Sequence, residues 1–494
     1  MRVLFTFFVC CFLGQLSAQT DTIRLNLEGI IELAHSDAPD VQIAKTIFSN
    51  NYWRFQSFLA DYRPQINFDA TLPDLNRSIE AITLPDGSDA FINRSLMTNF
   101  TGFTISQDIA PTGGNIFATT GLRRLDIFAT DGNDAQVSYL STPFWVGFTQ
   151  PLFQFNALKW DRKLAPLRYQ ESQKQYSENM EEIALEAAGL FFDVLIAQLN
   201  LQAARRDKAN ADTLYAISKG RFDVGRIAET ELLQIELNVM NADADVAENI
   251  VNMQTSTEEL RNFLGIQRAV FFDLVPPYEI PEFAVNVEEA LQYAFKNRSE
   301  MISFSRRLQE ARRDVEEAEK NSGVSMDLTL SFGLSKSAGT IGGAYKEIPD
   351  NERFRLGLSV PIADWGKARS RREIQVSNEA LTQLQVEQDR INFEREILIK
   401  VQQFDLVRNQ VDIALRAYEV AQKRLSITRK RYLVGNILIT DLNLAIREEA
   451  DARTNYIRTL RNFWLAYYEL RRLTLYDFEN DRPLIRNVEE TGIR

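Results

Sequence analysis

The sequence contains very few of the side chains that support nucleophilic or metal chemistry. Its 494 residues include two cysteines, Cys10 and Cys11, and a single histidine, His35. One imidazole gives little basis for serine–histidine catalysis or for a zinc–histidine site, and the cysteines lie side by side near the start of the chain. We therefore expect a protein that is not an enzyme and that holds no metal ion or cofactor.

Clusters of basic residues are also missing. The net charge is −12, the sequence pI is about 5.0, and no run of five or more basic residues occurs. Proteins that bind nucleic acid rely on clustered lysine and arginine, so nucleic acid is not an expected partner. No segment after residue 20 has the length and hydrophobicity of a transmembrane helix.

The first residues have the pattern of an export signal. "MRVLFTFFVCCFLGQLSAQT" has one arginine, an apolar run from Val3 to Leu13, and then small and polar residues that end in Ser17-Ala18. Eleven apolar residues are too few to span a bilayer as a helix, so a signal peptide cut after Ala18 is favoured over a membrane anchor. Both cysteines fall inside this run, without the context of lipid attachment. The exported chain is therefore expected to lack cysteine, and it could enter a membrane only as strands.

Two distant stretches of the chain are near copies of each other. "RFDVGRIAETEL" (221–232) and "RYLVGNILITDL" (431–442) share Arg, Val, Gly, Thr and Leu in register, at an offset of 210 residues. The same offset relates "FWVGFTQP" (144–151) to "FRLGLSVP" (354–361). This agreement at one offset indicates an internal duplication.

Nearer the start of the chain the offset is larger. "LEGIIELAHSDAPDV" (27–41) resembles "VEEALQYAFKNRSEM" (287–301) at an offset of 260. The difference between 260 and 210 means that the first copy carries 50 additional residues, which lie between 73 and 143. That segment is rich in turn signals such as "PTGG" and "DGND". Alternating pieces around 100–108 and 115–122 suggest that it includes an added hairpin.

These offsets predict how the chain is organised. The expected parts are a signal peptide (1–18), a first copy (19–275), a linker (276–283), a second copy (284–480) and a C-terminal tail (481–494). Each copy is expected to run in the order helix, strand, strand, long helix, turn, helix.

Four segments alternate apolar and polar residues with a period of two, as strands with two different faces do. They lie around 64–72, 144–151, 324–334 and 354–361. Such strands fit either a soluble sandwich or the wall of a membrane barrel. Four strands cannot close a barrel in one chain, and open sheet edges are excluded from lipid. Several chains would have to contribute, and three chains would supply twelve strands.

The long helices show a second pattern. From Phe404 to Tyr432, apolar residues recur at alternating spacings of three and four, and the same seam runs from Val194 to Phe222 with only Lys208 breaking it. Seams of this kind indicate coiled-coil packing. The helical run that ends at Tyr432 is about 100 Å long at 1.5 Å per residue, which predicts an elongated structure.

Together these features resemble the TolC-type outer-membrane channel family. The matching features are the two tandem copies and a strand that ends in "QPLF" (150–153) or "VPIADWG" (360–366) just before a long helix. Each copy also has an Arg-aromatic-x-Val-Gly turn and closes on Leu-Arg. The order and spacing of these motifs match over about residues 22–480.

The resemblance implies an α+β fold, a tandem-repeat outer-membrane factor. In this fold, four β-strands per chain complete a twelve-stranded trimeric β-barrel, and long helices form a periplasmic α-helical coiled-coil barrel. The implied function is that of a homotrimeric, passive, gated exit duct in the outer membrane of a Gram-negative bacterium, for a tripartite efflux or type I secretion system. Its implied partners are outer-membrane lipid, a periplasmic membrane-fusion adaptor that opens the duct, and an inner-membrane transporter that powers it.

The resemblance also implies roles for the two turns. The implied periplasmic aperture or gate consists of Asp441, Tyr432, Glu231 and Phe222. The implied helix-turn tip and adaptor-docking residues are Gly225, Gly435, Val224, Val434, Arg226 and Asn436.

Some of these positions have a simpler structural interpretation. The two glycines supply the positive φ that a turn between helices requires. Asp441 is equally well placed to be a helix N-cap or a first-turn acid. Ile437 and Leu444 stand where the family has a basic residue and a second acid, so we expect a single acidic ring from this copy and no strong cation blockade.

Two functions from other classes remain open at this stage. One is a non-transporting envelope scaffold or adhesin, with an elongated coiled coil and a soluble β domain. The other is a secreted enzyme, which would require clustered acids or a nucleophile–base pair, whereas the sequence offers only scattered carboxylates.

Overall fold

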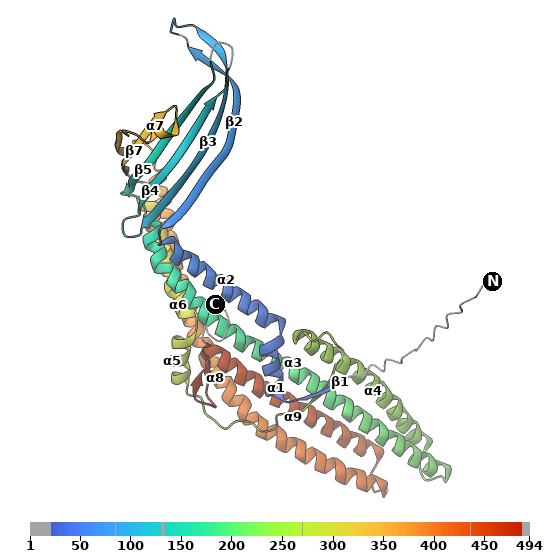
Figure 1. Cartoon of the computed structure of the whole chain (residues 1–494). Coiled ribbons are helices and arrows are strands. Elements are labelled where there is room, and N and C mark those ends of the chain that lie inside the picture. Colours follow the sequence, from blue (N-terminus) through green and yellow to red (C-terminus); the bar gives the residue numbers. More distant parts are fainter. Residues whose placement is uncertain (1–20, 84, 130–133, 269, 435, 487–494) are drawn as a thin grey trace, which may run out of the picture. The chain divides into compact units, whose positions relative to one another are not determined.

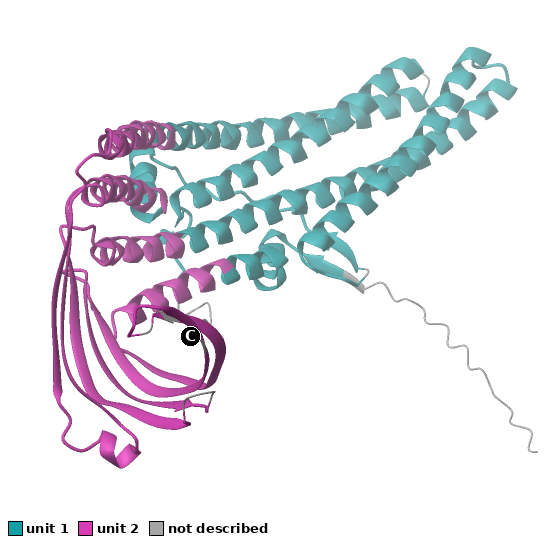
Figure 2. Ribbon diagram, turned by 90° about the horizontal axis from the view of Figure 1, so that it is seen from above, with its two compact units in different colours: residues 1–46, 175–298, 394–492 teal, residues 47–174, 299–393, 493–494 magenta. Residues whose placement is uncertain are grey.

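The computed structural model describes residues 21–83, 85–129, 134–268, 270–434 and 436–486. The predicted signal peptide with both cysteines, Gly435 and the end of the predicted tail lie outside the described residues. The chain forms two compact units, shown in different colours in Figure 2. The first unit contains 1–46, 175–298 and 394–492, and the second contains 47–174, 299–393 and 493–494.

The elements of the two halves correspond closely in length and position along the chain (Figure 1). Helix α1 (Leu27–Asp37) is followed by α2 (Pro39–Asp61), and α5 (Val287–Asn297) is followed by α6 (Glu300–Lys320). The bounds of α1 and α5 differ by 260 at both ends. Both helices begin with an asparagine cap, since the side chain of Asn26 accepts from the Gly29 N–H and that of Asn286 from the Glu288 N–H.

Four long helices follow the strands. Helices α3 (Ala157–Asp223) and α8 (Lys367–Leu433) each contain 67 residues, and their bounds differ by 210 at both ends. Helices α4 (Glu229–Phe263) and α9 (Ile439–Thr474) follow them after short turns. The chain thus contains a first helical hairpin, α3/α4, and a second helical hairpin, α8/α9.

The predicted heptad seam lies on the packed faces of α3 and α8. On α8, Phe404, Val411 and Ala414 are buried, and on α3, Val194 and Ala197 are buried. These side chains join a core that includes other fully buried aromatics, namely Phe191, Phe192 and Phe463. Lys208, the one residue that breaks the seam, is neutralised by ion pairs with Asp212 and Asp243.

The second unit contains one antiparallel sheet of six strands, which pair in chain order. The strands are β2 (Gln65–Thr83), β3 (Asp89–Ile109), β4 (Gly114–Ile127), β5 (Gln136–Leu152), β7 (Ser325–Ala338) and β8 (Asp350–Ser359). A single turn of helix, α7 (Ile341–Ala344), lies between the last two.

The sheet has two strands more than the four counted from the sequence. The added strands are β3 and β4, which come from the additional segment of the first copy and are joined by the "PTGG" turn. They contain the alternating pieces around 100–108 and 115–122 for which the sequence indicates an added hairpin, and both strands are longer than those pieces. The pairing of β2 with β3 shifts register between Thr71 and Asp74. The strands continue across such irregularities because backbone pairing with their neighbours continues.

Two small sheets complete the fold. The parallel pair β1 (Asp21–Leu25) and β6 (Val270–Leu274) lies in the first unit, and β9 (Tyr476–Asp477) pairs with β10 (Arg482–Pro483) near the end of the chain. In the part of the chain that the structure describes, no helix combines the length and hydrophobicity needed to cross a bilayer.

Candidate functional site

The first helical hairpin turns through a glycine with positive φ. Gly225 has φ of 72°, its N–H donates to the Phe222 carbonyl, and the Arg226 N–H donates to the Arg221 carbonyl. This pair of hydrogen bonds is the Schellman pattern, which ends a helix by satisfying its last carbonyls. A side chain here would be strained by the backbone angle, which accounts for the glycine.

The second hairpin repeats this pattern where it is described. The Asn436 N–H donates to the Arg431 carbonyl at 3.0 Å, which corresponds to the bond from Arg226 to Arg221 in the first hairpin. The Val434 N–H donates to the Lys430 carbonyl. Gly435 itself lies outside the described residues.

A small hydrophobic cluster near the turns joins the two hairpins. Its buried members are Ile235, Tyr432, Ile439 and Leu442, with Leu214, Tyr215, Leu425, Ile437 and Ile446 packed against them. The cluster combines side chains from all four long helices. Tyr432 is the largest of them and is only 2% exposed.

Tyr432 is also held by polar contacts from the first hairpin. Its hydroxyl lies 3.5 Å from the Ser218 hydroxyl, and the guanidinium of Arg221 lies 5.9 Å from the centre of its ring. Arg221 also donates to the carbonyl of Leu433 at 2.8 Å. We call Ser218, Arg221, Tyr432 and Leu433 the latch. The sequence did not suggest a role for Ser218 or Arg221, although the recurrence of the arginine in both copies was a signal.

The other predicted aperture residues lie at different depths. Asp441 is exposed in the first turn of α9, whose N-cap is Leu438, so Asp441 is a first-turn acid and not the cap itself. Its charge is favourable at the positive end of the helix dipole. Glu231 is half-buried in the first turn of α4, and Phe222 is 37% exposed. The structure therefore brings only Tyr432 into the cluster.

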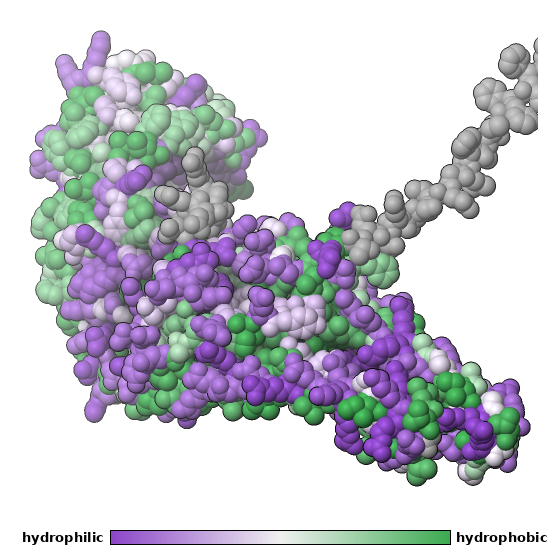
Figure 3. Space-filling model, turned by 90° about the horizontal axis from the view of Figure 1, so that it is seen from below, coloured by the Kyte–Doolittle hydropathy of each residue, from purple (hydrophilic) through white to green (hydrophobic). Residues whose placement is uncertain are grey.

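The predicted docking residues are exposed at the turns. Val224 is 68% exposed and Val434 is 71% exposed, and Arg226 and Asn436 are exposed beside them. In Figure 3, hydrophobic side chains gather at the free ends of the helical hairpins.

Polar pairs continue the contact between the hairpins away from the turns. The Asn238 side chain donates to Asn443 at 3.2 Å, and Arg206 pairs with the buried carboxylate of Glu449 at 3.5 Å. A cavity of about 860 Å³ lies between these helices and is lined largely by polar and charged side chains. Five members of the hydrophobic cluster also line this cavity: Leu214, Ile235, Leu425, Ile439 and Ile446.

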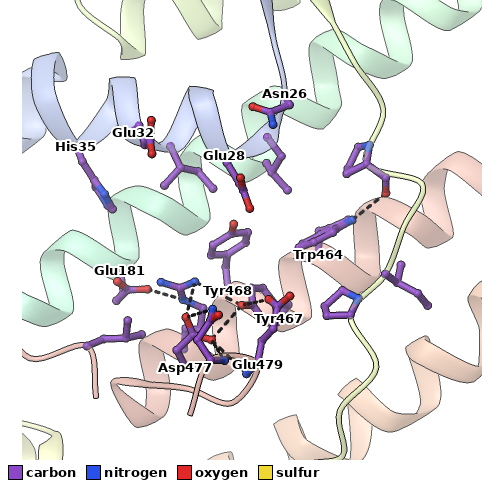
Figure 4. A pocket seen from close by; sticks show the side chains of 18 of the residues that line it. Asn26, Glu28, Glu32, His35, Glu181, Trp464, Tyr467, Tyr468, Asp477 and Glu479 are labelled. Atoms are coloured by element: carbon purple, nitrogen blue, oxygen red, sulfur yellow. Dashed lines mark hydrogen bonds and ion pairs between the residues drawn. The ribbon is translucent and has the colours of Figure 1, made fainter. Parts of the chain in front are cut away.

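A second cavity, of about 980 Å³, lies among α1, α9 and the end of the described chain (Figure 4). Arg471 pairs there with Glu181 at 3.1 Å and with Asp477 at 3.6 Å, and burial raises the pKa of Tyr467. Burial, together with the positive charge of Arg486, lowers the pKa of His35 to about 4. No group of three or more potential metal ligands occurs among the described residues.

Comparison with known proteins identifies the family. The model of the outer membrane efflux protein family matches residues 125–266 and 290–474, which together exceed half of the chain. The chain therefore belongs to the outer membrane efflux protein family, and the resemblance found in the sequence is confirmed. This is a family of outer-membrane transport ducts and not one of enzymes.

Individual relatives agree with this assignment. Outer membrane protein TolC of Vibrio cholerae is 26% identical over 343 residues, 66% of this chain and 75% of that protein. The alkaline protease secretion protein AprF of Pseudomonas aeruginosa is 22% identical over 345 residues, 68% of this chain and 69% of that protein. The chain is thus an outer-membrane protein of an efflux and secretion class.

The fold is shared with solved outer-membrane channels. The Campylobacter jejuni CmeC channel has a TM-score of 0.67 at 15% identity, over 94% of this chain and 89% of that chain. The Neisseria gonorrhoeae MtrE channel has a TM-score of 0.64 at 14% identity, over 92% and 90%. The predicted fold class, a tandem repeat of mixed helices and strands with long helical hairpins, is confirmed.

Proposed function

We propose that the protein is the outer-membrane exit duct of a tripartite efflux or type I secretion system, and that it works as a homotrimer. It is a passive channel, not an enzyme. The sheets of three copies form its membrane part, and the helical hairpins form a periplasmic tunnel. A periplasmic membrane-fusion adaptor opens the tunnel at the hairpin turns, and an inner-membrane transporter supplies the energy.

The main support for an oligomer is an apolar stripe on the exposed side of α8. Five residues spaced by seven are between 41% and 68% exposed: Ile399, Leu406, Ile413, Val420 and Ile427. We call them the α8 stripe. It lies about 140° around the helix from the packed seam, at 100° per residue. A helix with two apolar sides needs two neighbours, as each helix in a closed ring has.

Helix α4 offers a matching surface. Its exposed residues at alternating spacings of four and three are Leu233, Leu237, Met240, Ala244, Ala247 and Val251. We call them the α4 stripe. Because the two stripes lie on different hairpins, contact between α4 of one copy and α8 of the next joins copies head to tail, which is the arrangement that closes a ring.

The turns supply the docking surface and the gate. Val224, Val434, Arg226 and Asn436, around the two glycine turns, meet the adaptor. The latch holds the second hairpin against the first in the closed state, and docking separates them. Asp441, Glu231 and Phe222 then border the aperture, where three copies of an exposed carboxylate would attract cations and repel one another.

We also propose the processing and organisation that the sequence predicts. Residues 1–18 are removed on export, and the mature protein consists of the copies 19–275 and 284–480, the linker 276–283 and the tail. The constant offsets between corresponding helices, 260 for α1 and α5 and 210 for α3 and α8, support the division into two copies.

Membrane fractionation followed by electrophoresis tests the proposal. We expect the full-length protein in the outer membrane as a trimer that dissociates only on heating, and ion conductance when the trimer is placed in planar bilayers. Recovery as a soluble monomer would contradict the proposed function as a duct. An outer-membrane oligomer without conductance, even with adaptor present, would favour the scaffold instead.

A further inference from the structure

We propose that all six strands of the sheet lie in the membrane wall, so that three copies close a barrel of eighteen strands instead of twelve. The inference rests on the proposed trimeric duct. It assigns a role to the segment between 73 and 143, which otherwise has the character of a surface hairpin added to one copy.

The position of the added strands within the sheet is the first argument. β3 and β4 lie between β2 and β5, and residues Leu96–Ile109 of β3 pair with Gly114–Ile127 of β4 without a break. β2 pairs only with β3. The added strands therefore cannot lie outside the wall while β2 and β5 lie within it, because β2 would then lose its partner.

The second argument is an apolar band that crosses the added strands. Directly paired residues point to the same face of an antiparallel sheet. One row runs from β2 to β7 through Ile66, Ile105, Ala118, Val146 and Phe332. The next row has Gln107 on β3 and is apolar from β4 to β8, through Ile116, Phe148, Leu330 and Phe354. Ile105 and Ile116, on the added strands, are 45% and 47% exposed.

The opposite face of the same strands is polar. One row runs from β3 to β8 through Asp108, Asn115, Thr149, Thr329 and Arg355. Within this row the Asn115 side chain donates to Asp108 at 2.7 Å. The added strands thus have the two-faced pattern of membrane strands, with one face for lipid and one for the aqueous lumen.

Aromatic rings on the polar face are accommodated by glycines. The ring of Phe117 on β4 covers Gly147 on β5, where an added Cβ would lie 2.3 Å from it. Trp145 covers Gly333 on β7 in the same way, with 2.5 Å to an added Cβ. The added strand β4 thus packs against β5 through an aromatic–glycine pair, as β5 does against β7. This complementarity indicates that β4 belongs to the wall.

The free edges of the sheet show how copies join. β2 and β8 each have one unpaired edge, and hydrocarbon tolerates no unpaired backbone. Because six strands alternate in direction, β8 of one copy meets β2 of the next antiparallel, as every other pair in the sheet does. Only this head-to-tail contact satisfies both edges of every copy. The ten residues of β8 match the length that spans a bilayer as a tilted strand, about 9–11 residues.

Barrel diameter grows roughly linearly with strand number, so eighteen strands give a pore about 1.5 times as wide as twelve. The added strands would therefore widen the membrane part of the duct. This predicts passage of larger cargo through the outer membrane than a twelve-stranded relative allows.

Single-cysteine labelling of the full trimer in lipid vesicles tests the inference. Ile105→Cys and Ala118→Cys probe the apolar side of β3 and β4, and Thr104→Cys and Thr119→Cys probe the opposite side one residue away. Leu330→Cys and Thr329→Cys are the matched pair on β7, a strand of the original repeat. Each cysteine carries a fluorescent bimane, which lipids with brominated acyl chains quench on contact.

We expect brominated lipid to quench the labels at 105, 118 and 330 to a similar extent, at least twofold more than those at 104, 119 and 329. Quenching at 330 without quenching at 105 and 118 would overturn the inference while leaving the duct intact. Absence of quenching at 330 as well would contradict the membrane sheet and hence the proposed function. Electron microscopy of the trimer in lipid nanodiscs then counts the strands, and twelve would also overturn the inference.

Discussion

The two helical hairpins come from one duplicated sequence, yet the fold treats them differently. Phe222 and Tyr432 occupy the same position of the repeat, but Phe222 is 37% exposed and Tyr432 is buried beside Ser218 and Arg221. Helix α9 has 14 buried residues among its 36, whereas α4 has three among its 35 and exposes an apolar seam. Within the chain, α9 is thus packed more fully than α4, while α8 of the second hairpin also exposes an apolar stripe.

The same asymmetry separates α3 from α8. The positions of α3 that correspond to Ile413 and Val420 are Ala203, which is buried, and Asn210, which is half-buried and polar. The two corresponding helices thus differ, because α8 exposes apolar side chains at positions where α3 does not. The proposed ring requires such a difference, because a head-to-tail contact joins two unlike surfaces.

The largest effect is expected from charges placed on the α8 stripe. The double variant Ile413→Glu, Val420→Glu would bury two unpaired carboxylates between copies, so we expect loss of the heat-dissociable trimer. Gel electrophoresis without heating measures it. The control is Gln410→Glu, an exposed position on the same helix off the stripe. A trimer of normal heat stability in the double variant would show that the stripe faces solvent or lumen.

The next effect concerns the latch and compares the two turns directly. Tyr432→Ala removes a buried aromatic side chain, at a cost to local stability of about 3–5 kcal/mol, and we expect the closed trimer to conduct several-fold more in planar bilayers. Phe222→Ala, the matched change in the first copy, should change conductance little. Tyr432→Phe keeps the ring and removes only the hydroxyl, so it shows which of the two groups affects conductance. Equal conductance of all three variants and the unaltered trimer would exclude Tyr432 from the gate.

Many features of the two hairpins could be predicted from the sequence, and the features that could not be predicted depend on contacts between distant residues. The repeat, the long helices and the glycine turn depend on local patterns such as heptad spacing and positive φ, which act within a few residues. The burial of Tyr432 against Arg221 depends on contacts between residues more than 200 positions apart. The α8 stripe is hard to recognise in the sequence, because a spacing of seven without the intervening position is a weaker pattern than the packed seam beside it.

The added strands are indicated by the alternating pieces around 100–108 and 115–122, but their full length and their place in the sheet are not. Their alternation is broken by turns and by a register shift in the pairing of β2 with β3, and a short alternating segment alone does not show which strands it pairs with. The six-stranded order emerges only when the pairing of every strand is known.

A smaller effect is expected at Asp441, whose counterpart is Glu231. If three Asp441 carboxylates border the aperture, Asp441→Asn should reduce the preference of the open channel for cations, measured as a shift of reversal potential in a salt gradient. Glu231→Gln should shift it less, because Glu231 is half-buried. Loss of helix-dipole stabilisation would be about 0.3–1 kcal/mol and would not alter selectivity. An unchanged reversal potential with slightly lower thermal stability would identify Asp441 as a structural acid only.

The smallest effect is confined to mildly acidic solution and involves His35, whose counterpart in the second copy is Phe295. Burial and the nearby Arg486 lower the pKa of His35 to about 4 in the folded chain, against 6.5 for an unperturbed histidine. Between these values the unfolded chain binds the additional proton, so the free energy of unfolding should fall as pH drops from 6.5 toward 4. The loss would be about 1–3 kcal/mol and would be complete near the lower value.

His35→Phe, which makes the two copies alike at this position, should remove that part of the pH dependence. Denaturant unfolding of the trimer at a series of pH values measures it. The variant loses the hydrogen bond between the His35 Nε2 atom and the Met180 carbonyl, so it is expected to be less stable at pH 8 while showing a flatter profile below pH 6.5. Since His35 is the only histidine in the chain, its imidazole titration can be followed without ambiguity by magnetic resonance. An imidazole that titrates near 6.5 in the folded trimer would mean that assembly or solvent opens the cavity beside α1.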